Sequence, residues 1–255
     1  MRPTSSLNPI SALRLAGLVA LCSVVVVAGT SAAPGPHLSW DRCWGDGQVA
    51  NKVFACNTNT GAEVLVISYE SPVAVSGITG VEAELGIFYT GFIPPSGVTF
   101  PAWWEVFGSG RCRSTASAVI LAGAPTSLCV DPYQGLAQGG LAALRVDTQP
   151  TSTGSARLSM GVAVPPQTSW SVGPGTEDFL LELRISHRGT TGAGACDGCG
   201  SYRIMSIGFI RLLGPAGIPT IMLSPLSDGA SYVSWQGFAV PTRQSSWGSV
   251  KALYH

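Results

Sequence analysis

Residues 81–89 read VEAELGIFY, and in the first half of this stretch apolar side chains alternate with glutamates. The same period of two recurs at residues 157–164 (RLSMGVAV) and at residues 179–186 (FLLELRIS). Such alternation is typical of a β-strand that buries one face against a core and exposes the other. These three segments therefore predict a fold built from half-buried strands.

Five further segments are strand candidates, several of them apolar on both faces, and the connections between them are rich in Gly, Pro, Ser and Thr. They are residues 63–69, 118–122, 140–147, 203–213 and 232–238. The chain holds 32 Gly and 18 Pro, which disfavour long helices. We therefore expect an all-β fold, a single β-sandwich or jelly-roll-like domain of about eight or nine strands. One short helical turn is expected at residues 99–106.

The first 32 residues have the composition of a signal peptide. Arg2 and Arg14 precede an uncharged apolar run at residues 15–28, and small residues follow it. We expect cleavage after Ala32, which leaves a mature chain of 223 residues. The alternative is a retained membrane anchor, but the 14 residues of the apolar run fall short of the roughly 20 that span a bilayer. The expected organisation is a signal peptide at residues 1–32, a β-sandwich domain at residues 33–238, and a linker with a short amphipathic tail at residues 239–255.

The C-terminal tail has a helical rather than an alternating pattern. Trp247, Val250, Leu253 and Tyr254 would share one face of a short helix. Two roles are open for the tail: it packs loosely on the sandwich, or it serves as a docking or sorting peptide.

Cysteine usage agrees with export, because an even number of cysteines follows the predicted signal peptide. They are Cys43, Cys56, Cys112, Cys129, Cys196 and Cys199. Closing a short loop costs the least entropy, so we expect neighbouring cysteines to form disulfides. The expected pairs are Cys43–Cys56, Cys112–Cys129 and Cys196–Cys199. The last pair is a CxxC motif, but a strand is predicted to follow it instead of a helix, which favours a structural role over a redox role.

The charge balance excludes one class of partner. The 14 Lys and Arg residues equal the 14 Asp and Glu residues, so the basic surface needed for nucleic-acid binding is lacking. Three histidines leave little room for a His-rich metal site. We expect no cofactor and no metal. Calcium is the weaker alternative, because Asp41, Asp46, Asn57 and Asn59 cluster in the sequence, although without EF-hand spacing.

The adjacent residues Trp103 and Trp104 are the predicted ligand-binding residues. Two neighbours on a strand cannot both face inward, so at least one ring is expected to be exposed or to clamp a loop. An exposed indole ring stacks on the apolar face of a sugar, which makes the pair a candidate glycan contact. The alternative is that both rings fill the core, the role we expect for Trp235.

No residue is predicted to be catalytic, although two features keep a hydrolase open. Glu82 and Glu84 share a strand face with Cα atoms about 7 Å apart, and paired carboxylates perform glycoside hydrolysis. A solvated strand face explains these two residues more simply. His187 is the histidine farthest from the mature termini, and a hydrogen-bonded histidine at a strand end is its expected role. The sequence contains no nucleophile elbow, phosphate loop or dinucleotide fingerprint.

A set of short motifs carries a resemblance to a known family: residues 38–41 (LSWD) with Cys43, Asn51 and Lys52 with residues 54–59 (FACNTN), the Trp103–Trp104 pair, Cys112 with Arg113, the CxxC motif of Cys196 and Cys199, residues 235–237 (WQG) and the ending at residues 247–254 (WGSVKALY). In these motifs the chain resembles an uncharacterised family of secreted bacterial β-sandwich proteins that contain disulfides. The resemblance implies export but brings no known activity, cofactor or ligand.

Together these features predict a bacterial protein that is secreted, periplasmic or held at the cell surface. Its expected function is that of a non-enzymatic binding or structural module, with glycan binding through exposed Trp as the specific form. The expected partners are extracellular polysaccharide or surface proteins, with no nucleic acid and no membrane span after cleavage. The alternative is a secreted hydrolase that acts on polysaccharide.

Overall fold

The structure is a computed structural model that describes residues 33–89, 99–121, 129–147, 154–165, 167–215, 219–225 and 230–237. The predicted signal peptide and the predicted tail both lie outside the described residues. No helix within the described part of the chain is long and apolar enough to cross a membrane.

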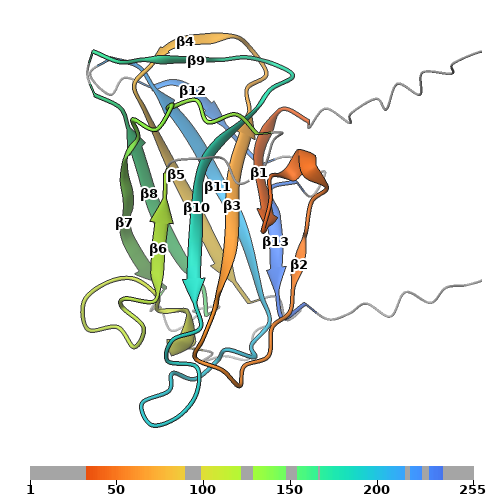
Figure 1. The fold of residues 1–255 in the computed structure, drawn as a ribbon, viewed down its shortest axis with the longest axis vertical. Helices are drawn as coiled ribbons and strands as arrows, with labels where there is room; N and C mark the ends of the chain where they lie inside the picture. The colour runs from red at the N-terminus through yellow and green to blue at the C-terminus, as the bar shows by residue number, and fades with distance from the viewer. Residues whose placement is uncertain are drawn as a thin grey trace, which may run out of the picture.

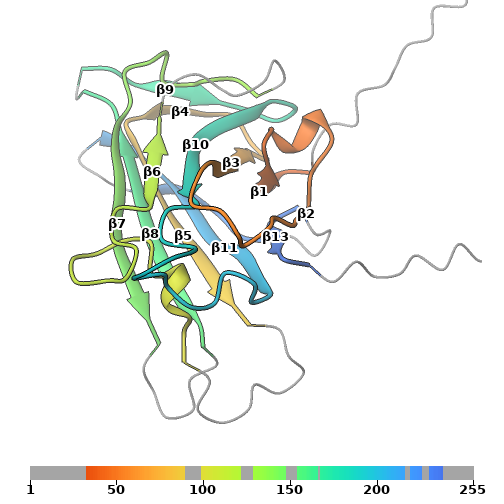
Figure 2. The same ribbon diagram turned by 60° about the horizontal axis from the view of Figure 1, so that its bottom comes forward.

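Two β-sheets pack face to face and form a sandwich (Figure 1). The first sheet has the order β1 (Gly35–Trp40), β3 (Ala62–Glu70), β10 (Glu177–Ser186) and β6 (Ser117–Ile120), and its neighbours are antiparallel. The second sheet has the order β2 (Asn51–Lys52), β13 (Tyr232–Trp235), β11 (Arg203–Leu213), β5 (Gly80–Phe88), β8 (Ala156–Ala163) and β7 (Gln138–Val146), with β12 (Pro219–Leu223) also beside β11. Figure 2 shows both sheets from one end of the strands.

A third, two-stranded sheet lies across one end of the sandwich, at the top of Figure 1. It pairs β4 (Val75–Ile78) with β9 (Trp170–Val172). We call this the upper end; β10 begins there and runs toward the lower end. β5 ends and β11 begins at the lower end, because these two strands are antiparallel.

The predicted all-β sandwich is confirmed, and each of the eight predicted segments contains a strand. Alternation identified the buried face of β5 correctly: Val81 and Leu85 are buried, whereas Glu82 between them is exposed. On β10 the prediction of a half-buried strand is wrong, because the opposite face, which carries Glu182, is buried as well. The expected helical turn is also present, as the 3-10 helix η2 (Ala102–Trp104). Five strands were missed, namely β1, β2, β4, β9 and β12. β1 alternates polar and apolar residues only over residues 37–40, and β2 and β9 are only two and three residues long.

The prediction that Trp103 or Trp104 is exposed is wrong, because both side chains are fully buried. The pair belongs to the turn η2 and not to a strand, so neighbouring side chains can both point inward. Their rings meet edge to face, with centroids 5.1 Å apart, and both contact Trp235 at 5.1 and 5.2 Å. Trp235 is fully buried, as predicted. These rings fill the lower end of the core and offer no face to a ligand.

The six cysteines of the described residues all form disulfides, but the predicted pairing is wrong. The bonds join Cys43 to Cys129, Cys56 to Cys199 and Cys112 to Cys196, across 86, 143 and 84 residues. The sandwich brings distant loops together where its strands end, so proximity in space does not follow proximity in sequence. The CxxC cysteines bond to two different loops and not to each other, which agrees with the predicted structural role.

Candidate functional site

Glu82 and Glu84, the carboxylates considered for hydrolysis, lie on the outward face of β5. Glu82 accepts a hydrogen bond from Arg211 at 3.1 Å, and Glu84 lies 3.6 Å from Arg157. The two arginines extend from the adjacent strands β11 and β8. These contacts match the solvated strand face that was preferred, and the two glutamates do not form a catalytic pair across a groove.

His187 occupies the strand-end position that the sequence predicted. It directly follows β10, and its ring stacks on Phe54 with centroids 3.7 Å apart. Nδ1 lies 2.7 Å from the carbonyl oxygen of Thr60, and Nε2 lies 2.9 Å from a carboxylate oxygen of Glu63. Both ring nitrogens are therefore occupied by partners that fix the loop after β10.

Two of the four residues considered for calcium, Asp41 and Asn59, have protein partners. Asp41 pairs with Lys52 at 2.5 Å, and Lys52 also contacts Glu63 at 2.8 Å. The Asn59 side-chain oxygen accepts the backbone N–H groups of Thr190 and Thr191 at 2.8 and 2.9 Å. The oxygens of Asp41 and Asn59 thus take part in contacts that hold the fold together.

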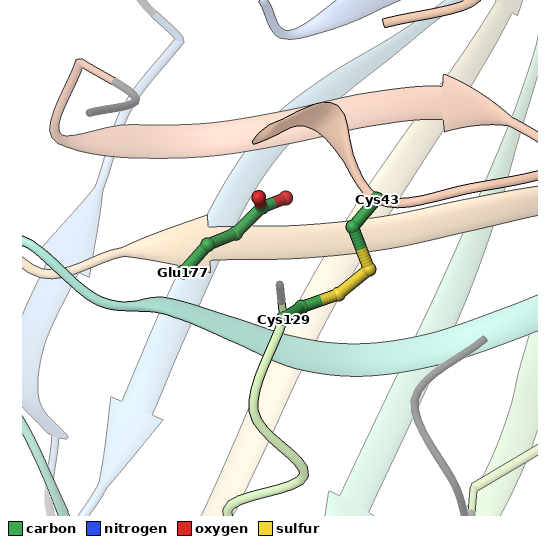
Figure 3. Close-up of side chains that lie close together, drawn as sticks. All are labelled: Cys43, Cys129 and Glu177. Carbon is green, nitrogen blue, oxygen red and sulfur yellow. A yellow bond between two sulfur atoms is a disulfide. The ribbon is translucent and has the colours of Figure 1, made fainter. Parts of the chain in front are cut away.

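A different group of side chains has the composition of a metal site but not its chemistry. Figure 3 shows the carboxylate of Glu177 beside Cys43 and Cys129. Both sulfurs belong to the Cys43–Cys129 disulfide, so neither is a thiolate that could bind a metal. Glu177 serves the fold instead, because its carboxylate accepts the backbone N–H groups of Trp44 and Gly45 at 2.9 and 2.8 Å.

Glu177 is an ionised anchor on the outer face of the first sheet. Burial alone would raise the pKa of Glu177, but His37, the Ser68 hydroxyl and the Gly45 N–H together hold this pKa below its usual range. The anchor fixes the turn η1 (Trp44–Asp46) against β3 and β10. A side chain at Gly45 would collide with Glu177, because an added Cβ would lie 2.8 Å from Oε2.

The next residue, Asp178, points to the opposite face of the sheet and borders the upper pocket of the sandwich. This pocket has a volume of about 510 Å³ and lies among β9, the beginning of β10 and the loop at residues 130–136. Its buried floor comprises Tyr133, Val164, Trp170, Val172 and Asp178. Its exposed mouth comprises Val130, Gln134, Leu136, Ser169, Ser171 and Thr176.

Two floor residues have a buried polar atom without a hydrogen-bond partner: the Tyr133 hydroxyl and one carboxyl oxygen of Asp178. The Tyr133 and Trp170 rings meet edge to face, with centroids 5.0 Å apart. An unpartnered buried polar atom costs about 1–3 kcal/mol, and native proteins rarely keep several together without a reason. The floor is therefore the strongest candidate for a functional site in the described part of the chain.

The electrostatics of the floor set Asp178 apart from Glu177. Burial, followed by the charges of Glu70 and Glu177, raises the pKa of Asp178 from 3.8 to about 7. Burial also raises the pKa values of Tyr69 and Tyr133, which stay neutral. A carboxyl group poised near neutral pH in a pocket is a common property of binding and catalytic sites.

The walls of the upper pocket are fixed by the backbone. Val130 exchanges two backbone hydrogen bonds with β10, at 2.9 Å to Glu177 and 2.8 Å from Phe179, next to the Cys43–Cys129 disulfide. Asp131 accepts the N–H groups of Tyr133 and Gly135 at 2.9 and 3.3 Å, which closes the loop on itself. The pocket is thus formed before any ligand arrives.

The sequence did not reveal the upper pocket, because the strand predicted at residues 179–186 leaves Glu177 and Asp178 outside it. β10 in fact begins at Glu177, so the two carboxyl groups project to opposite faces. The usable signal was two adjacent acids at the start of an apolar strand, where one of them must face the core.

No family model matches the chain, and no curated protein matches it. Among solved structures, the chain is similar to a cohesin module from a family 33 glycoside hydrolase of Clostridium perfringens, with 8% sequence identity and a TM-score of 0.29. The similarity covers 79% of this chain and 94% of the cohesin module. A similarity at this TM-score does not bear on what this chain does.

Proposed function

We propose that the protein is a binding module that takes a small, neutral, hydroxyl-rich ligand, such as one unit of a polysaccharide, in the upper pocket. The observation that carries the proposal is the floor of the pocket, where the Tyr133 hydroxyl and one carboxyl oxygen of Asp178 have no hydrogen-bond partner. Sugar hydroxyls both donate and accept hydrogen bonds, so they complement a hydroxyl and a carboxyl group at once.

The charge and shape of the pocket favour a neutral sugar over an anion. Among the described residues that line it, Asp131 and Asp178 are acidic and none is basic. Val130 and Leu136 are 49% and 48% exposed at the mouth and supply apolar contacts for the C–H groups of a sugar ring. Ser171 and Gln134 add polar groups beside them. Small-molecule pockets commonly combine apolar walls with a few polar groups in this way.

Hydrolysis of a polysaccharide is the second candidate, and Asp178 is the observation that favours it. A carboxyl group with a pKa of about 7 holds a proton that a general acid could donate. Asp131 is the other carboxylate on the pocket wall, and it accepts two backbone N–H groups of its own loop. We rank binding first, because hydrolysis also needs a second carboxylate free to act as base or nucleophile.

Blocking the mouth of the upper pocket is expected to abolish sugar binding without unfolding the protein. Ser171→Arg places a long side chain at the exposed edge of β9 and should weaken binding of a neutral oligosaccharide about tenfold or more, a loss of at least ~1.4 kcal/mol. Isothermal titration with a panel of neutral and uronate-containing oligosaccharides measures this effect. Thr115→Arg adds the same side chain at an exposed site outside the pocket and should leave the affinity unchanged.

Two results decide between the candidates. Binding that survives Ser171→Arg, or a panel in which no neutral sugar binds, contradicts the proposed module. Release of new reducing ends by the wild-type protein, with loss of that activity in Ser171→Arg, supports hydrolysis.

We also propose that the protein is a secreted bacterial protein whose mature domain begins at Ala33. Three disulfides support export, because such bonds persist in oxidising compartments. The carbonyl oxygen of Ala33 lies 2.7 Å from the His37 ring, and β1 begins two residues after Ala33. N-terminal sequencing of the exported protein is expected to start at Ala33. Recovery of an intact leader in the membrane fraction contradicts this and supports the anchor.

A further inference from the structure

A second pocket lies at the lower end of the sandwich, opposite the upper pocket. It has a volume of about 450 Å³, and the residues around it include Tyr89, Phe100, Pro101 and Arg203. Tyr89 directly follows β5, and Arg203 is the first residue of β11. We call it the Arg203 pocket.

Arg203 is a buried cation with few partners. Arg203 is only 2% exposed, yet its Nε has no hydrogen-bond partner. Within the described residues, the guanidinium donates one hydrogen bond, from Nη1 to the carbonyl oxygen of Tyr202 at 3.1 Å, and no carboxylate pairs with it. The Tyr89 ring lies 5.1 Å from the guanidinium carbon and supplies a cation–π contact.

The other buried arginine shows what a purely structural guanidinium looks like in this protein. Arg113 donates from Nη1 to Trp103 at 2.6 Å, from Nε to Arg188 at 2.8 Å, and from Nη2 to Ser186. All three of its nitrogens are satisfied by carbonyl oxygens, and its guanidinium lies 3.7 Å above the Trp103 ring. Arg203 is as deeply buried as Arg113, but the Nε–H of its guanidinium has no hydrogen-bond partner.

The walls of the Arg203 pocket are held rigidly. Cys196 and Cys199 are each fixed by a disulfide, and they enclose Asp197 and Gly198 on the pocket wall. The carbonyl oxygen of Asp197 accepts a hydrogen bond from the backbone N–H of Trp103 at 2.8 Å. An added side chain at Gly198 would clash with Pro101, so the two segments are in close contact.

We propose that the Arg203 pocket binds a small carboxylate with a flat apolar body. A guanidinium presents parallel N–H groups that match the two oxygens of a carboxylate, and such charged hydrogen bonds are stronger than neutral ones. Phe100 and Pro101 offer apolar surface to the rest of the ligand. Asp197 also lines the pocket, and its negative charge favours a singly charged carboxylate over a doubly charged phosphate. This site is independent of the function proposed for the upper pocket.

The wild-type protein alone gives the first test. Isothermal titration at pH 7 and constant ionic strength compares benzoate with benzamide, which has the same shape and no charge, and with inorganic phosphate. Benzoate is expected to bind about tenfold or more tightly than benzamide, since a charged hydrogen bond is worth about 1.5–3 kcal/mol, and phosphate more weakly than benzoate. Equal affinity for benzoate and benzamide, or tighter binding of phosphate, overturns the proposal.

Variants then test whether Arg203 is the residue that binds benzoate. Arg203→Lys keeps the charge but loses the fork, so it should weaken benzoate binding about tenfold or more. Arg211→Gln removes an exposed guanidinium from the same strand and is the matched control, with unchanged affinity expected.

If Arg203→Lys does not fold, nitrogen-15 NMR of the wild-type protein can follow the Nε–H signals of the buried arginines. Movement of one of these signals on adding benzoate supports the proposal. A spectrum that does not change contradicts it. Ser171→Arg should leave benzoate binding intact, which separates this proposal from the proposed function.

Discussion

Trp103→Ala is expected to lower the free energy of unfolding by about 3–5 kcal/mol, the usual cost of emptying an aromatic site in a core. Trp103 is fully buried, and its ring contacts the rings of Trp104 and Trp235. The indole N–H also donates to the Thr190 hydroxyl at 2.9 Å, so the truncation leaves a cavity and removes a buried hydrogen bond, while the hydroxyl still donates to the carbonyl oxygen of His187. Urea denaturation followed by tryptophan fluorescence and circular dichroism measures the change.

Because Arg113 lies against Trp103, we expect the loss of unfolding free energy in Trp103→Ala to fall in the upper part of the range given above. Its guanidinium lies against the Trp103 ring, and burial lowers the pKa of Arg113 to about 10. Removing the ring takes away the cation–π contact of a charge that has no carboxylate partner among the described residues. Trp103→Phe keeps an aromatic face beneath Arg113 and should cost less than half as much.

Tyr232→Ala is the matched control for the aromatic truncation. Tyr232 is 47% exposed, and its removal should change the free energy of unfolding by less than about 1 kcal/mol. If Trp103→Ala is no more costly than Tyr232→Ala, the aromatic cluster is not the core of the lower end. The prediction also bears on ligand tests: loss of glycan binding in an alanine variant of Trp103 or Trp104 would report a damaged core and not a lost contact.

The secondary structure was largely predictable because a sandwich imposes period two on its strands. The stretch at residues 81–89 and its two counterparts carry that period, and all became strands. β1 escaped detection because its alternation is short: only residues 37–40 alternate between polar and apolar side chains, directly after Gly35 and Pro36. Burial on both faces is not the reason, because β10 is buried on both faces and still alternates in sequence.

The sites were less predictable, for two physical reasons. Disulfide partners and pocket walls come from loops that are distant in sequence, and only the strand order brings Cys56 to Cys199 or Val130 to Asp178. Local geometry also decides what a side chain can do. Trp103 and Trp104 were judged by strand geometry, which would expose one of them, but a 3-10 turn buries both. The sequence thus identified the cysteines and tryptophans as important, but it did not show which residues contact one another.

Asp178→Asn is expected to stabilise the protein at pH 8 by about 2–4 kcal/mol and to have little effect at pH 3. The folded state holds the proton of Asp178 more tightly than the unfolded chain, because its pKa rises from 3.8 to about 7 on folding. Each pKa unit corresponds to about 1.4 kcal/mol. Wild-type stability from this group is therefore fully present below about pH 4 and is lost as the pH rises toward 7. Asparagine keeps the shape without the charge, so the variant avoids the loss.

Glu177→Gln is the control with the opposite sign, at the neighbouring position on the same strand. The pKa of Glu177 is lowered in the folded state, so its stabilisation is present above its ordinary pKa and is lost as the pH falls. Glu177→Gln should therefore destabilise the protein at pH 7 and have less effect at pH 3. Urea denaturation of the three proteins between pH 3 and pH 8 separates the two groups. If Asp178→Asn changes the free energy of unfolding equally at pH 3 and pH 8, Asp178 is not a buried, protonated acid. The upper pocket would then lack a carboxyl group poised near neutral pH.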